Sequence, residues 1–138
     1  MKKLVIGLLC IIICLSYFVY ISYYHIDVTS YEIKSHKIND DINIVMIADV
    51  HDQNCLIKDD IVHKIQELNP DIILCNGDII DDESVSDDNI LAFLAKLADI
   101  SDVYMSLGNH EYSFYEGHMD DLKRIEDIGI DILEEEYK

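Results

Sequence analysis

The sequence predicts an α/β fold with a mostly parallel sheet, and two observations carry this prediction. Short apolar runs of strand length alternate along the chain with longer segments that have helical periodicity. About 30 residues separate one run from the next, which is the length that a strand–helix–strand unit needs. Such a succession places helices on the faces of a parallel sheet. The strands are predicted at residues 42–47, 72–75, 103–107 and 130–133.

Three helices are predicted to connect these strands. The first is expected to begin after Asp59 and Asp60, which offer an N-cap and a negatively charged first turn. The second follows an acidic loop, and the third is expected over residues 120–127 with Gly129 as its C-cap. Residues 31–38 alternate in polarity and suggest an additional edge strand. The side chains expected to face the core are Ile61, Ile65, Leu68, Ile90, Leu91, Leu94, Leu97, Leu122 and Ile125.

An uncharged apolar segment precedes the predicted domain and runs from Leu4 to about Tyr24. About 20 apolar residues are enough to span a bilayer as a helix. A cleaved signal peptide has a shorter apolar core of about 7–15 residues and ends in small residues. Residues 17–24 instead contain bulky aromatic rings, as in an interfacial aromatic belt. We therefore expect residues 1–25 to be a retained transmembrane signal-anchor and residues 26–138 to form the domain.

The basic residues around this segment indicate an orientation. Lys2 and Lys3 lie directly before it, whereas Lys34 and Lys37 lie some distance beyond its other end. The positive-inside rule then favours an amino terminus in the cytoplasm. The expected location is the cell membrane, with a single pass and the domain on the extracytoplasmic side.

The composition argues against a nucleic-acid-binding protein and against a small protein held together by disulfides. With 10 basic and 28 acidic residues, the chain has a net charge of −18 and should repel nucleic-acid backbones. The four cysteines do not form a disulfide framework, because Cys10 and Cys14 lie inside the apolar segment. Cys75 ends a predicted buried strand, where a free thiol behaves as a small apolar group. The sequence leaves a Cys55–Cys75 bridge open.

Three polar motifs each follow a predicted strand. They are Asp49-Val50-His51, Gly77-Asp78-Ile79-Ile80-Asp81 and Gly108-Asn109-His110-Glu111. Because parallel strands present their carboxyl ends at one edge of the sheet, these motifs should converge in space. Carboxylates brought together in this way repel one another unless cations intervene. The mixture of carboxylate, imidazole and amide suits manganese, iron or zinc better than calcium.

The three motifs, in this order, resemble those of the calcineurin-like metallophosphoesterases, whose pattern is D-x-H, G-D-x-x-[ND] and G-N-H-[ED]. The resemblance covers the chain from about Tyr31 to its end. It implies a metallophosphoesterase-like α/β/β/α sandwich, of which this chain contains the first half only. The family also uses a further histidine and a G-H-x-H motif later in the chain, so we expect a domain that is incomplete at its C-terminal side.

The resemblance also implies a role for each motif residue. Two divalent metal ions, either manganese, iron or zinc, are implied as cofactors. Asp49 and His51 would bind the first ion, Asp78 would bridge the pair, and the side-chain oxygen of Asn109 would bind the second. A metal-activated hydroxide would attack phosphorus, and His110 would either protonate the leaving oxygen or stabilise the charge that builds on it.

Two further motif residues are expected to support the ligands rather than to bind metal. Asp81 occupies the last position of its motif and is expected to orient the loop. Glu111 is expected to lie behind the ligands. Asp49, Asp78 and Asn109 could instead be ordinary turn residues. This interpretation has the least support where the residue directly follows a buried strand.

The leading functional hypothesis is a membrane-anchored, metal-dependent phosphoesterase that hydrolyses a phosphomonoester, a diester or a pyrophosphate. Its partners would be the phosphate-ester substrate and, through the N-terminal helix, the lipid bilayer. The alternative is a truncated, catalytically inactive membrane protein that binds metal. A phospho-accepting receiver domain and a haloacid-dehalogenase-type site are disfavoured, because both expect an acidic residue where His51 stands.

Overall fold

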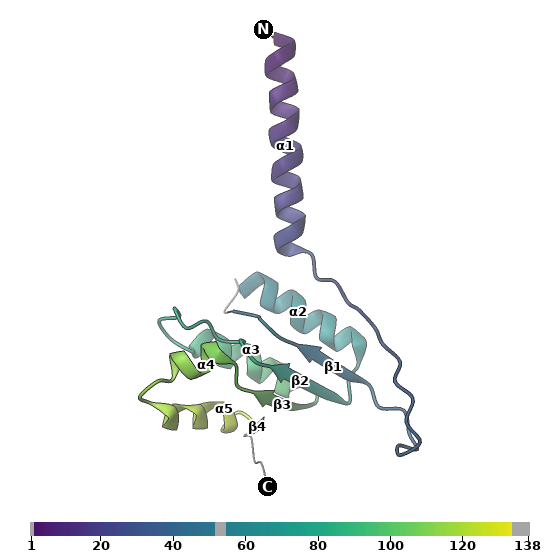
Figure 1. Cartoon of the computed structure of the whole chain (residues 1–138), viewed down its shortest axis with the longest axis vertical. Helices are drawn as coiled ribbons and strands as arrows, with labels where there is room; N and C mark the ends of the chain where they lie inside the picture. The colour runs from purple at the N-terminus through teal and green to yellow at the C-terminus, as the bar shows by residue number, and fades with distance from the viewer. Residues whose placement is uncertain (1, 52–54, 134–138) are drawn as a thin grey trace. The chain divides into compact units, whose positions relative to one another are not determined.

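The computed structural model describes residues 2–51 and 55–133 of the 138-residue chain. The chain divides into two compact units, residues 1–35 and residues 36–138, and each is described by itself. Figure 1 shows the elements of both units in chain order.

The first unit contains one long helix, α1 (Lys2–Tyr24). Its central segment Val5–Ser22 has a mean hydropathy of 2.5, and none of it is buried against the rest of the protein. A helix of this length and composition is typical of a membrane span and also of an N-terminal signal sequence. The edge strand predicted at residues 31–38 is wrong, since these residues form no strand and Ile33 is 90% exposed. Alternating polarity does not make a strand when no neighbouring strand supplies hydrogen bonds.

The second unit is built on a four-stranded parallel sheet in the order β1-β2-β3-β4. The strands are β1 (Ile44–Ile47), β2 (Ile72–Asn76), β3 (Asp102–Ser106) and β4 (Ile130–Leu133). This arrangement confirms the predicted α/β class and the predicted strand succession. β1 begins two residues later than expected. Just before β1, the carbonyl oxygen of Asn43 accepts hydrogen bonds from the backbone N–H groups of both Asp71 and Ile72, at 2.8 and 3.3 Å.

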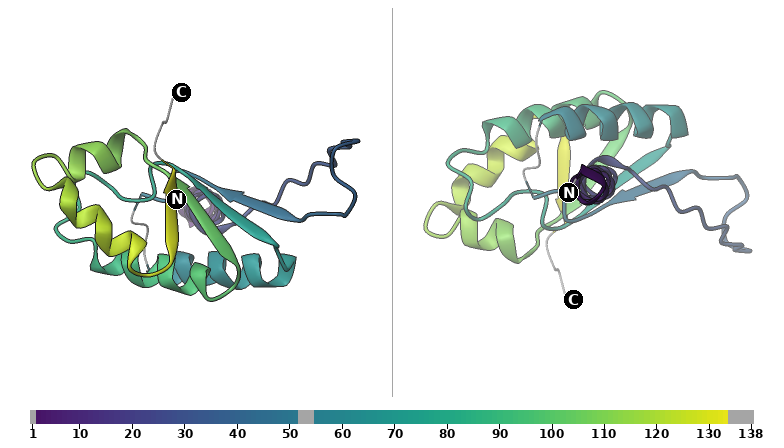
Figure 2. Two further views of the ribbon diagram at one scale, coloured as in Figure 1. Left: turned by 90° about the horizontal axis from the view of Figure 1, so that it is seen from below. Right: turned by 90° about the horizontal axis from the view of Figure 1, so that it is seen from above.

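Helices cover one face of this sheet. α2 (Cys55–Leu68) and α3 (Asp88–Ala98) lie on the same side in both views of Figure 2. The short helix α4 (Asn109–Phe114) follows β3, and the 3₁₀ turn η1 (Met119–Leu122) leads into α5 (Lys123–Glu126) and then β4. The helical core residues predicted from the sequence include Ile65, Ile90, Leu94, Leu97 and Ile125, all of which are buried.

Two helix predictions need correction. α2 begins at Cys55, so Asp59 and Asp60 lie inside the helix rather than before it. Asp59 does not cap the helix and instead forms an ion pair with Lys96 of α3, at 2.6 Å. The predicted helix at 120–127 is divided, because its first turn is the 3₁₀ turn η1 and only its second half is α-helical.

The two faces of the sheet differ in burial. On the face beneath the helices, Ile73, Val103 and Met105 are fully buried, and Val45 and Ile47 of β1 are partly buried. On the opposite face, Ile44 and Met46 of β1 are 51% and 63% exposed. Leu74 and Tyr104, on the same face, are partly buried. Parallel sheets are normally covered on both faces, but in the part of the chain that the structure describes this face is exposed at β1.

Candidate functional site

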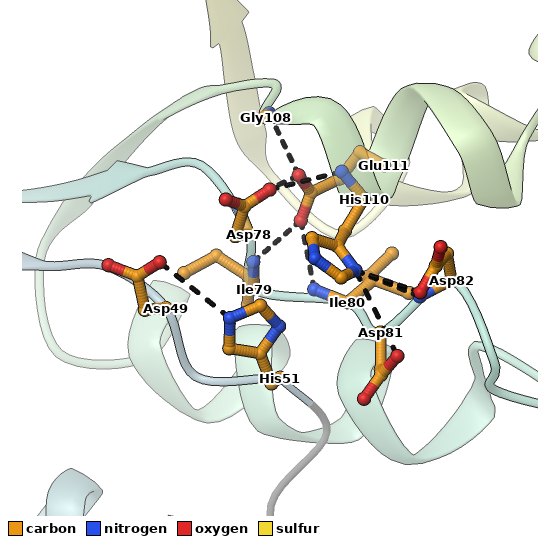
Figure 3. Close-up of polar contacts among 10 residues, drawn as sticks. All are labelled: Asp49, His51, Asp78, Ile79, Ile80, Asp81, Asp82, Gly108, His110 and Glu111. Carbon is orange, nitrogen blue, oxygen red and sulfur yellow. Dashed lines mark hydrogen bonds and ion pairs between the residues drawn. The ribbon is translucent and has the colours of Figure 1, made fainter.

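The three motif loops meet at the carboxyl ends of β1, β2 and β3, as Figure 3 shows. The loop after β1 is hydrogen-bonded directly to the loop after β2. The backbone N–H of Asp49 donates to the Gly77 carbonyl oxygen, and that of His51 donates to the Asp78 carbonyl oxygen, both at 3.2 Å. The backbone N–H of His110, in the loop after β3, donates to Asp78 Oδ1 at 3.0 Å. Asp78 therefore connects all three loops.

Glu111 fixes these loops from beneath. Its side chain is completely buried, and its two carboxylate oxygens accept hydrogen bonds from four backbone N–H groups. Oε2 accepts from Asp78 and Gly108, at 2.9 and 2.8 Å, and Oε1 accepts from Ile79 and Ile80, at 2.6 and 2.8 Å. A carboxylate has enough lone pairs for all four donors. Glu111 thus organises the backbone and does not face the open side of the site.

The backbone adopts an uncommon conformation at three of the predicted site residues. Asp49, His51 and Asp78 have φ angles of 53°, 47° and 53°, in the left-handed region that few residues other than glycine adopt. Such conformations concentrate at functional sites, where the surrounding structure enforces them. Here the enforcing contacts are the hydrogen bonds that link the motif loops.

Gly108 is required by the close approach of the second and third loops. A Cβ atom at this position would lie 2.3 Å from Asp78 Oδ1 and 2.6 Å from the backbone nitrogen of Asp78. Any side chain here would displace Asp78. The glycine of the third motif therefore serves packing between loops.

His110 lies at the centre of the polar cluster in Figure 3. Its ring contacts the ring of His51 edge-on, with the centroids 4.6 Å apart and an interplanar angle of 77°. Its Nδ1 atom is 2.9 Å from Asp82 Oδ1 and 3.9 Å from Asp81 Oδ1. His110 and His51 are both partly buried, with side chains 27% and 30% exposed.

Asp81 stabilises its own turn. Its Oδ1 accepts a hydrogen bond from the backbone N–H of Glu83 at 3.1 Å, and its carbonyl oxygen accepts from the N–H of Ser84 at 3.0 Å. The Glu83 N–H is the main cause that lowers the pKa of the Asp81 carboxyl below its usual value. Asp81 therefore stays negatively charged beside the two histidines.

Of the four predicted metal ligands, Asp49 and His51 lie near each other, but a close group of three potential ligand atoms is formed by other residues. Asp49 Oδ1 lies 3.6 Å from His51 Nε2, and the Asp49 side chain is 72% exposed. Asn109 is exposed and begins α4. Among the residues that the structure describes, a group of potential ligand atoms all within 4.8 Å of one another comprises Asp81, Asp82 and His110.

Sequence reasoning gave no role to Asp82. The only available signal was its position directly after the second motif, beside Asp81. Its contact with His110 depends on the fold of the loop, which the sequence pattern does not reveal. Similarly, the motif placed Glu111 behind the ligands without indicating that it binds four backbone groups.

The chemistry of this donor set fits divalent metal ions. Asp49 and Asp78 offer carboxylate oxygens and His51 offers an imidazole nitrogen, all from loops held by hydrogen bonds at one edge of the sheet. Carboxylate and imidazole together are suited to manganese, iron and zinc. Metal ions would also offset the repulsion among the acidic side chains gathered here.

Comparison with known proteins agrees with this geometry. Residues 42–135 match the family model described as calcineurin-like phosphoesterase. Over 94 residues, the chain is 30% identical to an uncharacterised metallophosphoesterase of Campylobacter jejuni, a match that covers 62% of this chain and 24% of that relative. The chain therefore spans about a quarter of the length of this relative. The family match covers more than half of the chain and includes all three motifs, so the chain belongs to the calcineurin-like phosphoesterase family.

Proposed function

We propose that the domain at residues 26–138 is part of a metal-dependent phosphoesterase that hydrolyses a phosphomonoester, a diester or a pyrophosphate. The observation that carries the proposal is the hydrogen-bonded junction of the three motif loops around Asp78. Membership in the phosphoesterase family supports the reaction class. A junction of this kind keeps acidic and imidazole groups at fixed positions, as metal-assisted hydrolysis requires.

In this proposal, Asp49, His51, Asp78 and Asn109 hold two divalent ions, either manganese, iron or zinc. When bound, such ions offset the negative charge of the phosphoryl oxygens and make water a better nucleophile near neutral pH. The contribution of the chain is rigidity. The Asp78 side chain is held by the His110 N–H, and the Asp78 backbone is held by Glu111.

His110 is proposed to supply the proton for the leaving group. A water oxygen bonds to phosphorus, and the bond from phosphorus to the leaving oxygen breaks with its electron pair on that oxygen. His110 donates a proton to this oxygen, and the proton released by the attacking water passes to solvent, from which His110 is protonated again. An imidazole is suited to this exchange near neutral pH.

We propose that residues 1–25 remain attached as a membrane anchor, with the domain on the extracytoplasmic side. The length and apolarity of α1 support this assignment. Amino-terminal sequencing of the protein from membranes should return residues from the intact amino terminus. A soluble form that begins near residue 25 would instead identify the segment as a cleaved signal sequence.

A second candidate function is that of an inactive, metal-binding membrane protein. The ligands proposed here leave two ions incompletely coordinated, and the resemblance expects further histidines later in the chain. On this basis we expect the 138-residue chain alone to show little or no hydrolysis.

Activity measurements separate the two candidates. We expect a version extended through the G-H-x-H motif to hydrolyse a nitrophenyl phosphate with manganese, at a rate well above that of the 138-residue chain. In the extended protein, His110→Ala should reduce kcat by about 100-fold or more while metal affinity changes little. His63→Ala, at an exposed position on α2, serves as the matched control. Equal rates for the short and extended chains would contradict the proposed division of the site.

A further inference from the structure

We propose that Asp87 is a positioning residue, whose contact with Tyr115 holds the end of α4 and thereby fixes Asn109, a proposed metal ligand, at the beginning of that helix. The inference rests on the proposed function for the role of Asn109, but the coupling of Asp87 to α4 can be tested without metal. The observation that carries it is a buried hydrogen bond of 2.9 Å, which the Tyr115 hydroxyl donates to Asp87 Oδ2.

Asp87 stands at the N-cap of α3 but does not cap that helix. An aspartate at an N-cap ordinarily accepts a hydrogen bond from a backbone N–H in the first helical turn. The Asp87 side chain makes no such bond. It is only 5% exposed, and its two oxygens accept from Tyr115 after α4 and from Nη1 of Arg124 in α5. The carboxylate therefore links α3, α4 and α5 instead of capping one of them.

The bond between Tyr115 and Asp87 has a fixed direction. A carboxylate only accepts hydrogen bonds, so the hydroxyl is the donor. Burial of Tyr115 and its bond to Asp87 raise the pKa of this hydroxyl well above its ordinary value, so it keeps its proton near neutral pH. Arg124 offsets the charge of the buried carboxylate. The bond is therefore present whenever the domain is folded near neutral pH.

The helix α4 is bonded at both of its ends to the segment that follows β2. At its beginning, Glu111 accepts from the N–H groups of Ile79 and Ile80, and at its end Tyr115 donates to Asp87. Glu111 and Tyr115 are four residues apart, so they lie on the same face of the helix, and both are fully buried. A helix of six residues is not stable by itself. Its orientation therefore depends on these two attachments.

The attachment at the end of α4 affects the position of Asn109 at its beginning. Asn109 is the first residue of α4, and Tyr115 follows the last one. The six residues between these positions correspond to about 9 Å along a helix axis. Without the contact to Asp87, α4 would be held through Glu111 at its first turn only. A tilt of the free end would then move the side-chain oxygen of Asn109.

The rival interpretation is that these contacts only stabilise the fold. In that case, loss of the Tyr115 hydroxyl would lower the free energy of unfolding but leave the metal affinity of the folded protein unchanged. Asp88 offers a matched control. Its Oδ1 accepts from Nη2 of the same arginine, Arg124, at 2.7 Å, but its side chain is 76% exposed.

The first test is a calorimetric titration of manganese into the full chain in detergent micelles, with every variant shown to be folded. Tyr115→Phe removes the hydroxyl and keeps the buried ring. We expect it to weaken manganese binding by about tenfold, as is common for contacts that orient metal ligands. Asp87→Ala should have a similar effect. Asp87→Asn should restore much of the affinity, because its amide can bond to both the arginine and the hydroxyl. Asp88→Ala should bind manganese as wild type does.

A double-mutant cycle tests whether the effect passes through Asn109. Tyr115→Phe combined with Asn109→Ala should bind manganese no more weakly than Asn109→Ala alone, because the positioned ligand is already missing. Additive losses of affinity would overturn the proposal. An unchanged affinity in Tyr115→Phe would overturn it as well.

The second test is amide hydrogen exchange of the metal-free chain, which does not depend on the proposed function. The reporter is the N–H of Tyr112 in α4, which donates to the Gly108 carbonyl oxygen at 3.2 Å. In Tyr115→Phe this amide should exchange about tenfold faster, whereas that of Leu74 in β2 should exchange as in wild type. Unchanged exchange at Tyr112, or equal acceleration at both amides, would overturn the coupling. If the coupling is found but Asn109→Ala binds manganese as wild type does, the proposed ligand role of Asn109 is wrong and the attachment of α4 by Asp87 is confirmed.

Discussion

The buried and exposed sides of the motif loops use the same chemical group in opposite ways. On the buried side, the Glu111 carboxylate has no exposure to solvent and is saturated by backbone N–H groups. On the exposed side, the Asp49 carboxylate is 72% exposed, and its Oδ1 atom lies 3.6 Å from His51 Nε2. The comparison indicates that Glu111 stabilises the loops, whereas the carboxylate of Asp49, a proposed metal ligand, makes no comparable contact with the backbone of the other loops in the part of the chain that the structure describes. Mutations should therefore separate loop stability from metal binding.

The largest expected effect is on the buried side. Glu111→Ala leaves four backbone N–H groups without their acceptor, and each buried unsatisfied group costs about 1–3 kcal/mol. We expect the free energy of unfolding to fall by at least about 3 kcal/mol, measured by urea denaturation of the full chain in detergent. Glu116→Ala, at an exposed position after α4, is the matched control and should change stability by less than about 0.5 kcal/mol. Similar values for both variants would show that the loops do not depend on Glu111.

Gly108→Ala should have the next largest effect, because the new Cβ would overlap the Asp78 side chain and backbone. Overpacking of this kind costs about 1–3 kcal/mol, and the shift of Asp78 should also weaken manganese binding. Gly117→Ala is the informative comparison. Its φ of +84° is unfavourable for alanine, but the added Cβ would meet no atom within 4 Å. Stability should fall in both variants, whereas metal affinity should fall only for Gly108→Ala.

Asp78→Asn tests whether the charge of Asp78 contributes to metal binding, because it changes the charge of the side chain and hardly its shape. The amide oxygen can still accept from the His110 N–H, so the loops should keep their arrangement. Loss of the charge should reduce manganese affinity by tenfold or more, which corresponds to about 1.4 kcal/mol of binding free energy. Asp102→Asn, at the opposite end of the sheet, controls for nonspecific attraction to the acidic surface. Equal affinities in a calorimetric titration would show that the surface, rather than the site, holds the ion.

The smallest expected effect is that of Asp49→Gly on stability. Glycine adopts the φ of 53° without strain, which stabilises the folded state. Glycine also makes the unfolded chain more flexible, which destabilises the folded state by about 0.4–1 kcal/mol. These effects oppose each other, so the free energy of unfolding should change by less than about 0.5 kcal/mol. Asp49→Ala keeps the strained angle and should be less stable than Asp49→Gly in the same urea titration. The reverse order would mean that strain at this position is unimportant.

Much of this fold could be predicted because its strands are short apolar runs that each carry their own signal. The run at 72–75 coincides with β2 almost completely, and β4 matches its predicted bounds. The predicted edge strand at 31–38 failed because a strand depends on a partner that local pattern does not specify. α4 was missed because its six residues begin inside the third motif, where the sequence signal is that of a loop.

The site was predictable to the level of which loops meet, but not of which atoms touch. Motif order and strand topology bring Asp49, Asp78 and His110 to one edge of the sheet. The contact between Asp82 and His110 depends on the path of the turn after Ile80, and that path is determined by hydrogen bonds to Glu111. Contacts of this kind depend on three-dimensional packing, which residue spacing does not reveal.

The left-handed backbone conformation at Asp49 affects how the protein would tolerate one particular mutation. An aspartate codon becomes a glycine codon by a single base change, and glycine suits this backbone conformation. This single base change should therefore remove the side chain with little effect on the stability of the fold. Screens that score expression level would treat such an allele as wild type. If Asp49 binds metal as proposed, an assay of metal binding would reveal the change.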